Sequence, residues 1–103
     1  MAEVGQRQPR QLDPTYLKRL RTQPCCLCDG IDVEAHHIRL ASINDDKHSP
    51  GLGAKASDKW VVPLCNRHHR ELHTQGEMQF WASLGINPFA LSLQYQQDWG
   101  VVL

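Results

Sequence analysis

Apolar residues recur along this chain with two spacings, one typical of helices and one of strands. The first helical stretch opens at Asp13 and Pro14, because Asp is a preferred N-cap and Pro is favoured in the first turn. The apolar stripe that follows at helical spacing consists of Tyr16, Leu17 and Leu20. We expect this helix to end before Pro24.

Two short runs favour β-strands. Val33 to Leu40 alternates loosely between apolar and polar residues and includes two adjacent histidines. Trp60 to Leu64 is β-branched and aromatic and predicts the second strand of a hairpin, in which Pro63 indicates an edge strand or a strand end. The irregular segment between them, Ala41 to Lys59, predicts a long loop of the kind that is often functional.

Three more helices are expected in the C-terminal half. Asn66 can cap a helix that runs to about Thr74. A second helix is expected over Glu77 to Leu84, and a third is expected to have Asn87 as its cap and Pro88 in its first turn. Their aromatic residues are expected in the core rather than on a base-stacking surface: Phe80, Trp81, Tyr95 and Trp99.

A chain of 103 residues and 11.7 kDa, 41% of it hydrophobic, fits one small domain that cannot bury a large core. Such a domain needs a cross-link, and four Cys and six His can supply one. Residues 1–11 are polar and not typical of a signal peptide, so we expect a reducing cytoplasm and favour metal over disulfides. No apolar run is long enough to cross a bilayer.

The formal net charge of +0 argues against a uniformly basic surface for nucleic acid. Basic residues nevertheless outnumber acidic ones by five to two from the N-terminus to Arg21. We expect residues 1–12 to be a flexible basic arm and residues 13–103 to be a single domain. Within that domain a metal-binding core is expected at about 24–76 and C-terminal helices over 77–99.

Two pairs of residues predict a structural zinc site. Cys25 and Cys28 are separated by two residues in a turn that ends at Gly30, which is free to adopt a left-handed conformation. Cys65 and His68 repeat this spacing downstream. The two pairs supply four soft or borderline ligands for a tetrahedral ion, and the C-x2-C spacing favours Cys25 over the cysteine that follows it. Buried, reduced thiols are the alternative for an isolated pair.

The remaining histidines predict a second, reactive site. In a helix, His69 and His73 lie on nearly one face and can hold one ion together. Adjacent strand residues point to opposite faces, so of His36 and His37 one ligates and the other stays free. With His36 as third ligand, an open position remains for water or phosphate, and a free imidazole nearby is suited to deprotonate a water. Taken singly, each histidine also suits an ordinary strand or surface position.

The combined pattern resembles the HNH endonucleases, which have a ββα-metal fold. The resemblance covers about residues 24–74 and is carried by Cys25-x2-Cys28, Ala35-His36-His37-Ile38 and Val62-Pro63-Leu64-Cys65-x2-His68-His69-x3-His73. It implies an α+β fold with a small ββα-metal domain (β-hairpin plus metal-binding helix), a zinc knuckle and flanking N- and C-terminal helices. It also implies that His37 is the general base. The implied ligands are His36, His69 and His73 for the catalytic divalent ion, and Cys25, Cys28, Cys65 and His68 for structural zinc.

One position departs from the HNH pattern. By count, Trp60 falls where the family usually has Asn, and Asp58 is the nearest polar substitute for orienting the base. The resemblance implies hydrolysis of DNA phosphodiester bonds with Mg, Mn or another divalent ion. The flanking residues are similar to small prophage-encoded HNH proteins, some tied to recombination, so phage recombination or DNA processing is a candidate role and a recombination protein a candidate partner.

We therefore expect a metal-dependent DNA endonuclease of low sequence specificity. Basic residues near the hairpin and the metal-binding helix are candidate phosphate contacts: Arg39, Lys55, Lys59, Arg67 and Arg70. Each is equally compatible with an exposed, solubilising charge. The alternative is a non-catalytic zinc-stabilised module that binds nucleic acid or protein, which needs the first site but not the second. The oligomeric state stays open.

Overall fold

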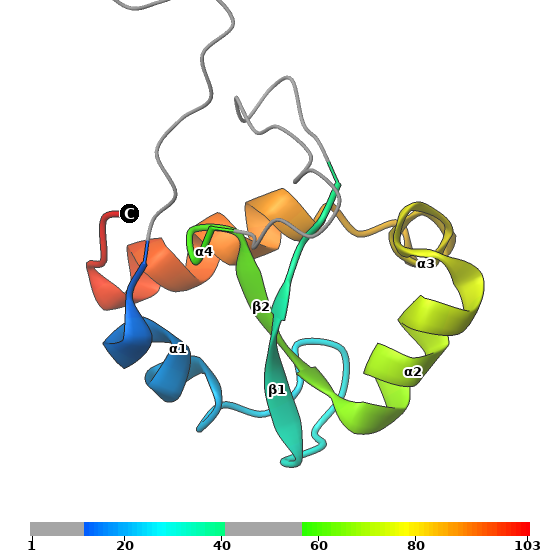
Figure 1. Cartoon of the computed structure of the whole chain (residues 1–103), viewed down its shortest axis with the longest axis horizontal. Coiled ribbons are helices and arrows are strands. Elements are labelled where there is room, and N and C mark those ends of the chain that lie inside the picture. The colour runs from blue at the N-terminus through cyan, green and yellow to red at the C-terminus, as the bar shows by residue number, and fades with distance from the viewer. Residues whose placement is uncertain (1–11, 41–56) are drawn as a thin grey trace, which may run out of the picture.

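The computed structural model describes residues 12–40 and 57–103. Its elements follow in the order α1 (Pro14–Leu20), β1 (Val33–His37), β2 (Val61–Cys65), α2 (Asn66–Gln75), α3 (Glu77–Leu84) and α4 (Pro88–Trp99). The two strands form an antiparallel sheet, with α1 and most of α4 on one side of it and α2 and α3 on the other (Figure 1). The described residues therefore form a small α+β structure, as predicted.

Each face of the hairpin has its own apolar core. Val61 packs with Tyr16 and Leu20 of α1, and Tyr95 and Trp99 of α4 border this cluster. The side chains of Val62 and Leu64 join the second cluster, which includes Leu72, Phe80, Trp81 and Phe89 from the three C-terminal helices. Because both faces are covered, all five residues of β2 are buried.

Two helix starts are formed as the sequence predicts. At α1, the side chain of Asp13 accepts a hydrogen bond from the backbone N–H of Tyr16 at 3.0 Å. At α4, the side chain of Asn87 accepts one from the N–H of Phe89 at 2.9 Å. A Pro at the first helical position follows in both cases, where its missing N–H costs nothing. The bounds of α3 also agree with the prediction.

The first strand is shorter than expected and the second continues past its proline. β1 ends at His37; the N–H of Ile38 still donates to the carbonyl of Trp60 at 2.8 Å, and the N–H of Arg39 then donates to the carboxylate of Glu77 at 3.0 Å. Pro63 pairs with Ala35 in the middle of β2, so the strand does not end there. A two-stranded sheet tolerates this because the proline lies on an edge strand.

One prediction about the C-terminal half is wrong. Asn66 does not cap α2: the N-cap position belongs to Cys65, and the Asn66 amide instead donates to the carboxylate of Asp32 at 2.8 Å. Leu84, in the last turn of α3, is 47% exposed. The predicted arm, residues 1–12, lies outside the described residues apart from Leu12.

The free edge at the start of β2 is held by α4. The fully buried hydroxyl of Ser92 accepts a hydrogen bond from the N–H of Val61 at 3.1 Å and donates to the carbonyl of Lys59 at 2.8 Å. Gln96 donates to the same carbonyl at 2.6 Å. Backbone groups that a two-stranded sheet leaves unpaired are thus satisfied, and the strand that ends at Cys65 is fixed in place.

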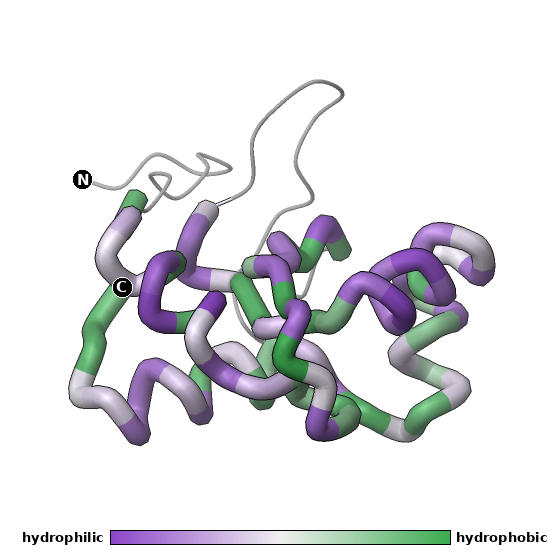
Figure 2. Tube along the Cα trace, turned by 90° about the horizontal axis from the view of Figure 1, so that it is seen from below, coloured by the Kyte–Doolittle hydropathy of each residue, from purple (hydrophilic) through white to green (hydrophobic). Residues whose placement is uncertain are grey.

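The helix that follows β2 is the most polar element of the fold. Leu72 is the one buried residue of α2, and the rest of this helix is drawn mostly in hydrophilic colours (Figure 2). A helix so poor in apolar side chains derives little stability from burial, so other contacts must hold it on the hairpin. In the part of the chain that the structure describes, no helix has the length and apolar character to span a membrane.

Candidate metal centres

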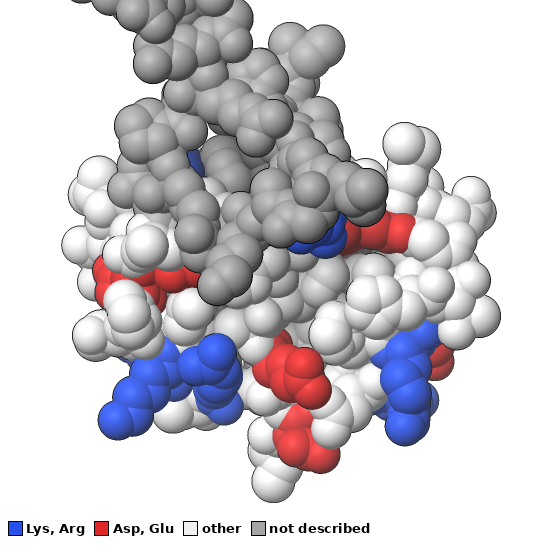
Figure 3. All heavy atoms as spheres, viewed as in Figure 1, with Lys and Arg blue, Asp and Glu red and all other residues white. Residues whose placement is uncertain are grey.

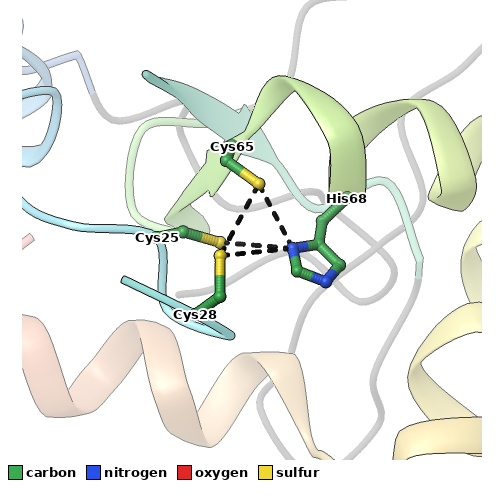
Figure 4. Close-up of side chains that lie close together, drawn as sticks. All are labelled: Cys25, Cys28, Cys65 and His68. Atoms are coloured by element: carbon green, nitrogen blue, oxygen red, sulfur yellow. Dashed lines mark hydrogen bonds between the residues drawn. The ribbon is translucent and has the colours of Figure 1, made fainter. Parts of the chain in front are cut away.

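Four side chains from three parts of the fold converge on one point (Figure 4). Cys25 and Cys28 lie in the turn after α1, Cys65 ends β2, and His68 lies in the first turn of α2. The His68 Nδ1 atom lies 3.2 Å from the Cys65 Sγ atom and 3.7 Å from each of the other two sulfur atoms. All four ligand atoms lie within 4.8 Å of one another.

These separations fit a tetrahedral zinc ion. Zn–S bonds of about 2.3 Å and Zn–N bonds of about 2.0–2.1 Å place two sulfur atoms about 3.8 Å apart and sulfur about 3.6 Å from nitrogen. The Sγ atoms of Cys28 and Cys65 are 3.9 Å apart. Backbone N–H groups of Leu27 and Gly30 point at the sulfur atoms of Cys25 and Cys28, each at 3.4 Å, and would stabilise thiolate charge. The cluster can hold a structural metal such as zinc, as predicted.

Gly30 serves this cluster in a different way from the one predicted. It does not have a positive φ; within the described residues that conformation is found at Gly76, Gly85 and Gly100. A Cβ atom at Gly30 would lie 3.3 Å from the Sγ atom of Cys28 and 3.3 Å from the Cβ atom of Cys65. A side chain here would therefore crowd two ligands, so glycine suits this position because the backbone passes close to them and not because it turns left-handed.

The cysteines differ in their readiness to ionise. Burial opposes ionisation of the Cys65 thiol, but hydrogen bonds from the backbone and ring of His68 and from the neighbouring thiols lower its pKa to about 6. Burial raises the pKa of Cys26 to about 12. Cys26 lies outside the cluster and packs against the apolar core, so it behaves as a small hydrophobic residue. The cluster thus contains Cys25 and not Cys26, as the spacing favours.

The three histidines predicted for a second site also come together. The His69 Nε2 atom lies 3.3 Å from the His36 Nδ1 atom and 3.2 Å from the His73 Nε2 atom. His36 is buried, whereas His73 is exposed, so the group lies at the surface. Among the described residues, the Cys3His cluster is the group whose ligand atoms all lie within 4.8 Å, so the three histidines are arranged more openly.

The surroundings favour the metal-binding state of His69 and set which nitrogen atoms of His69 and His36 face the group. Burial, followed by the neighbouring rings of His36 and His73, lowers the pKa of His69 and favours its neutral form. The Nδ1 atom of His69 lies 3.5 Å from a carboxylate oxygen of Glu34, which leaves Nε2 facing the other two rings. On His36, the Nε2 atom contacts the Glu77 carboxylate at 2.7 Å, so Nδ1 faces His69. The nitrogen atoms that converge are therefore those available as ligands.

The fourth histidine lies on the other face of the same strand. His37 is paired with Val61 and is 32% exposed at its side chain, so its ring is not enclosed in the interior. Its Nε2 atom lies 2.8 Å from one oxygen of Asp58, and the other oxygen of Asp58 accepts the N–H of Asp13 at 2.8 Å. Asp58, predicted as the group that orients His37, is buried and in contact with it.

The candidate phosphate contacts are placed unevenly. Arg67 and Arg70 are exposed on α2, and Lys59 lies before β2 with its ammonium group 5.0 Å from the ring centre of Trp60. Arg39 follows β1 and is also exposed. Lys55 lies outside the described residues. Basic side chains gather over α1 and over α2, with acidic side chains between them over β1 (Figure 3).

Comparison with known proteins gives one family. The family described as a protein of unknown function (DUF968) matches residues 6–98. The chain belongs to this family. The matched segment contains all the candidate metal ligands of this DUF968 protein, together with His37 and Asp58.

One curated relative is similar to part of this chain. The uncharacterized protein YdfU of Escherichia coli (strain K12) is 37% identical over 65 residues, which cover 63% of this chain and 17% of the relative. The chain thus spans about a sixth of that relative's length. No solved structure matches.

Sequence reasoning missed Glu77 and the backbone contact of Asp13. Glu77 touches His36 from 41 residues away, at the start of a helix that was expected only to pack. An acidic residue directly after the predicted ligand helix was the available signal, but a first-turn Glu is also an ordinary helix-start residue. In this DUF968 chain, α3 therefore contacts His36 through Glu77, and the N-cap residue of α1, Asp13, is linked to His37 through Asp58.

Proposed function

We propose that this protein is a metal-dependent endonuclease that hydrolyses DNA phosphodiester bonds, with its hairpin and α2 forming the ββα-metal arrangement of the HNH enzymes. One observation carries the proposal. The His69 Nε2 atom lies 3.3 Å from a nitrogen of His36 and 3.2 Å from a nitrogen of His73, while the neighbouring His37 is held by a buried carboxylate. Three candidate metal ligands beside one imidazole that is not a ligand suit hydrolysis better than a purely structural metal site.

The three-histidine group fits a divalent ion in donor chemistry. Imidazole suits several divalent metals, and three protein ligands leave positions for water or a phosphate oxygen. His36, His69 and His73 would hold the ion, and Mg, Mn or another divalent metal is proposed. When bound, the ion would neutralise charge on the scissile phosphate and the leaving oxygen.

His37 would act as the general base. Its Nε2 atom faces a carboxylate oxygen, which can only accept a hydrogen bond, so the ring proton sits on Nε2. The Nδ1 atom is then free to take a proton from the attacking water. Asp58 would hold the ring in this orientation, while its second oxygen is fixed by the backbone of Asp13.

The exposed arginines Arg67 and Arg70 would contact the DNA backbone beside α2, and Arg39 and Lys59 would do so beside the hairpin. Contacts of this kind predict low sequence specificity and an affinity that falls as salt rises. A role in phage recombination or DNA processing, a recombination-protein partner and a cytoplasmic location remain parts of the proposal that rest on the sequence alone.

Nicking of a supercoiled plasmid with Mg²⁺ or Mn²⁺ tests the proposal. We expect the wild type to cut, a chelator to abolish cutting, and His37→Ala to lower the rate by about 10²–10⁴-fold because a general base contributes that much. Glu71→Ala, an exposed change on α2, serves as the matched control and should cut normally.

Two results would count against an enzyme. Equal cutting by the folded His37→Ala protein would point to a contaminant. If the wild type shifts DNA in a binding assay but does not cut it with any divalent ion, the zinc-stabilised binding module is the better description.

A further inference from the structure

Glu77 belongs to neither the hairpin nor α2, yet its carboxylate reaches the histidine group. It is the first residue of α3, and Gly76, at φ 90°, allows the chain to turn between α2 and α3. Three donors converge on the Glu77 carboxylate, whose side chain is 11% exposed. His36 Nε2 and Trp81 Nε1 lie 2.7 and 3.1 Å from one oxygen, and the N–H of Arg39 lies 3.0 Å from the other.

We propose that Glu77 is a positioning residue that fixes the tautomer and direction of the metal ligand His36. The inference deepens the proposed function and rests on the three-histidine site described there. Because a carboxylate accepts but cannot donate, the ring proton of His36 sits on Nε2, and the neutral ring presents its lone pair from Nδ1. That atom is the one 3.3 Å from His69 Nε2.

A neutral amide could not replace this carboxylate. Both oxygens of Glu77 accept hydrogen bonds, from His36 and Trp81 on one and from Arg39 on the other. In Glu77→Gln, one of the two positions becomes an NH₂ group that faces another donor, so either the ring of His36 or the backbone of Arg39 loses its acceptor.

The other ligands have weaker support of this kind. Glu34 approaches the Nδ1 atom of His69 only to 3.5 Å, and its side chain is 59% exposed. An exposed carboxylate at that distance constrains the ring little. The shielded carboxylate of Glu77 thus places the strongest constraint on the one ligand that comes from the sheet, and α3 becomes part of the site.

Ni²⁺ titration by calorimetry measures the effect, with the Cys3His cluster already loaded with zinc. We expect Glu77→Gln to bind Ni²⁺ about 10–100-fold more weakly than the wild type, as is usual when a group that supports a metal-bound His is removed. The matched control Glu71→Gln makes the same chemical change at an exposed position of α2 and should bind as the wild type does.

A second measurement separates positioning from general stability. The ¹⁵N shifts of the His36 ring, recorded without Ni²⁺, should show a protonated Nε2 and an unprotonated Nδ1 in the wild type. If Glu77→Gln does not fold, Trp81→Phe removes one donor to the carboxylate and keeps an aromatic ring in the core. We expect that variant to weaken Ni²⁺ binding and to alter the His36 shifts in the same direction.

The inference is overturned if the folded Glu77→Gln protein binds Ni²⁺ as tightly as the wild type, or if the wild-type His36 carries its proton on Nδ1. Neither readout involves DNA. A wild type that binds Ni²⁺ in a Glu77-dependent way but never cuts DNA would end the nuclease proposal and leave the role of Glu77 standing. If the wild type cuts DNA but Glu77→Gln leaves Ni²⁺ binding unchanged, the role of Glu77 is refuted and the nuclease proposal stands.

Discussion

Replacement of Asp58 by Asn is the sharpest test of how the proposed base is held. The Asp58 carboxylate is 7% exposed and links two elements, since one oxygen lies 2.8 Å from the Nε2 atom of His37 and the other 2.8 Å from the backbone nitrogen of Asp13. Asparagine keeps the size and shape of the side chain but has only one acceptor oxygen.

The backbone N–H of Asp13 has no tautomer to change, so the single amide oxygen of the Asp58→Asn side chain should stay with it. The amide NH₂ group then faces His37, and the ring must present Nε2 as an acceptor and carry its proton on Nδ1. The Nδ1 atom of His37 is then already protonated and cannot accept a proton from the attacking water. We expect the nicking rate to fall by about 10²–10⁴-fold, the contribution of a general base.

The cost in stability should be smaller than the cost in rate. A hydrogen bond to a charged group contributes about 1.5–3 kcal/mol and a neutral one about 0.5–1.5 kcal/mol, so exchanging the two bonds of Asp58 should cost about 2 kcal/mol. For a domain of this size that corresponds to a fall in melting temperature of about 8–16 °C. Asp58→Asn should thus stay folded at the assay temperature.

Single-turnover plasmid nicking, a thermal melt by circular dichroism and the ¹⁵N shifts of the His37 ring measure the three expected effects. Asp98→Asn is the matched control, because Asp98 is exposed on α4 and its side chain accepts a hydrogen bond from Gln94, far from the histidines in the sequence. A folded Asp58→Asn protein that cuts at the wild-type rate would refute the orientation role.

Three further changes probe the fold. Cys25→Ser should abolish cooperative thermal unfolding and zinc content, because zinc binding and folding are coupled in small sites, whereas Cys26→Ala should keep both; a native-like melt without zinc would contradict this. Ser92→Ala should cost about 1–3 kcal/mol in urea unfolding, since the N–H of Val61 loses its partner, and an unchanged midpoint would show that the bond is dispensable. Gly76→Ala should also cost about 1–3 kcal/mol, from backbone strain at φ 90° alone, because no atom lies within 4 Å of the added Cβ; a gain in stability would refute that reason.

Local signals predicted the parts of the fold that depend on neighbouring residues. The caps at Asp13 and Asn87 followed from a short polar side chain before a Pro, and both bonds span three residues or fewer. The Cys3His cluster followed from two matched spacings, because a tetrahedral ion accepts few other ligand sets. Each cap and each ligand pair lies within a few consecutive residues, so its signal can be recognised in the sequence.

Contacts between distant segments could not be predicted in the same way. The bond from His36 to Glu77 joins residues 41 apart, and no periodic pattern marks it. Asn66 looked like a helix cap, but the side chain of Asp32, 34 residues earlier, competes for its amide. The crowding at Gly30 depends on how closely the knuckle and Cys65 approach, which only the packed structure determines.

The position of His68 directly before His69 makes the two centres depend on the same length of chain. Successive residues of a helix are rotated by about 100°, so the turn of α2 that aims His68 at the sulfur atoms also sets the direction of His69. Insertion of a single residue between them would rotate either His68 away from the cysteines or His69 away from the other histidines, while the other ligand kept its direction. Members of this family that change length at that junction should therefore have lost one centre, whereas insertions between β1 and β2 should leave both intact.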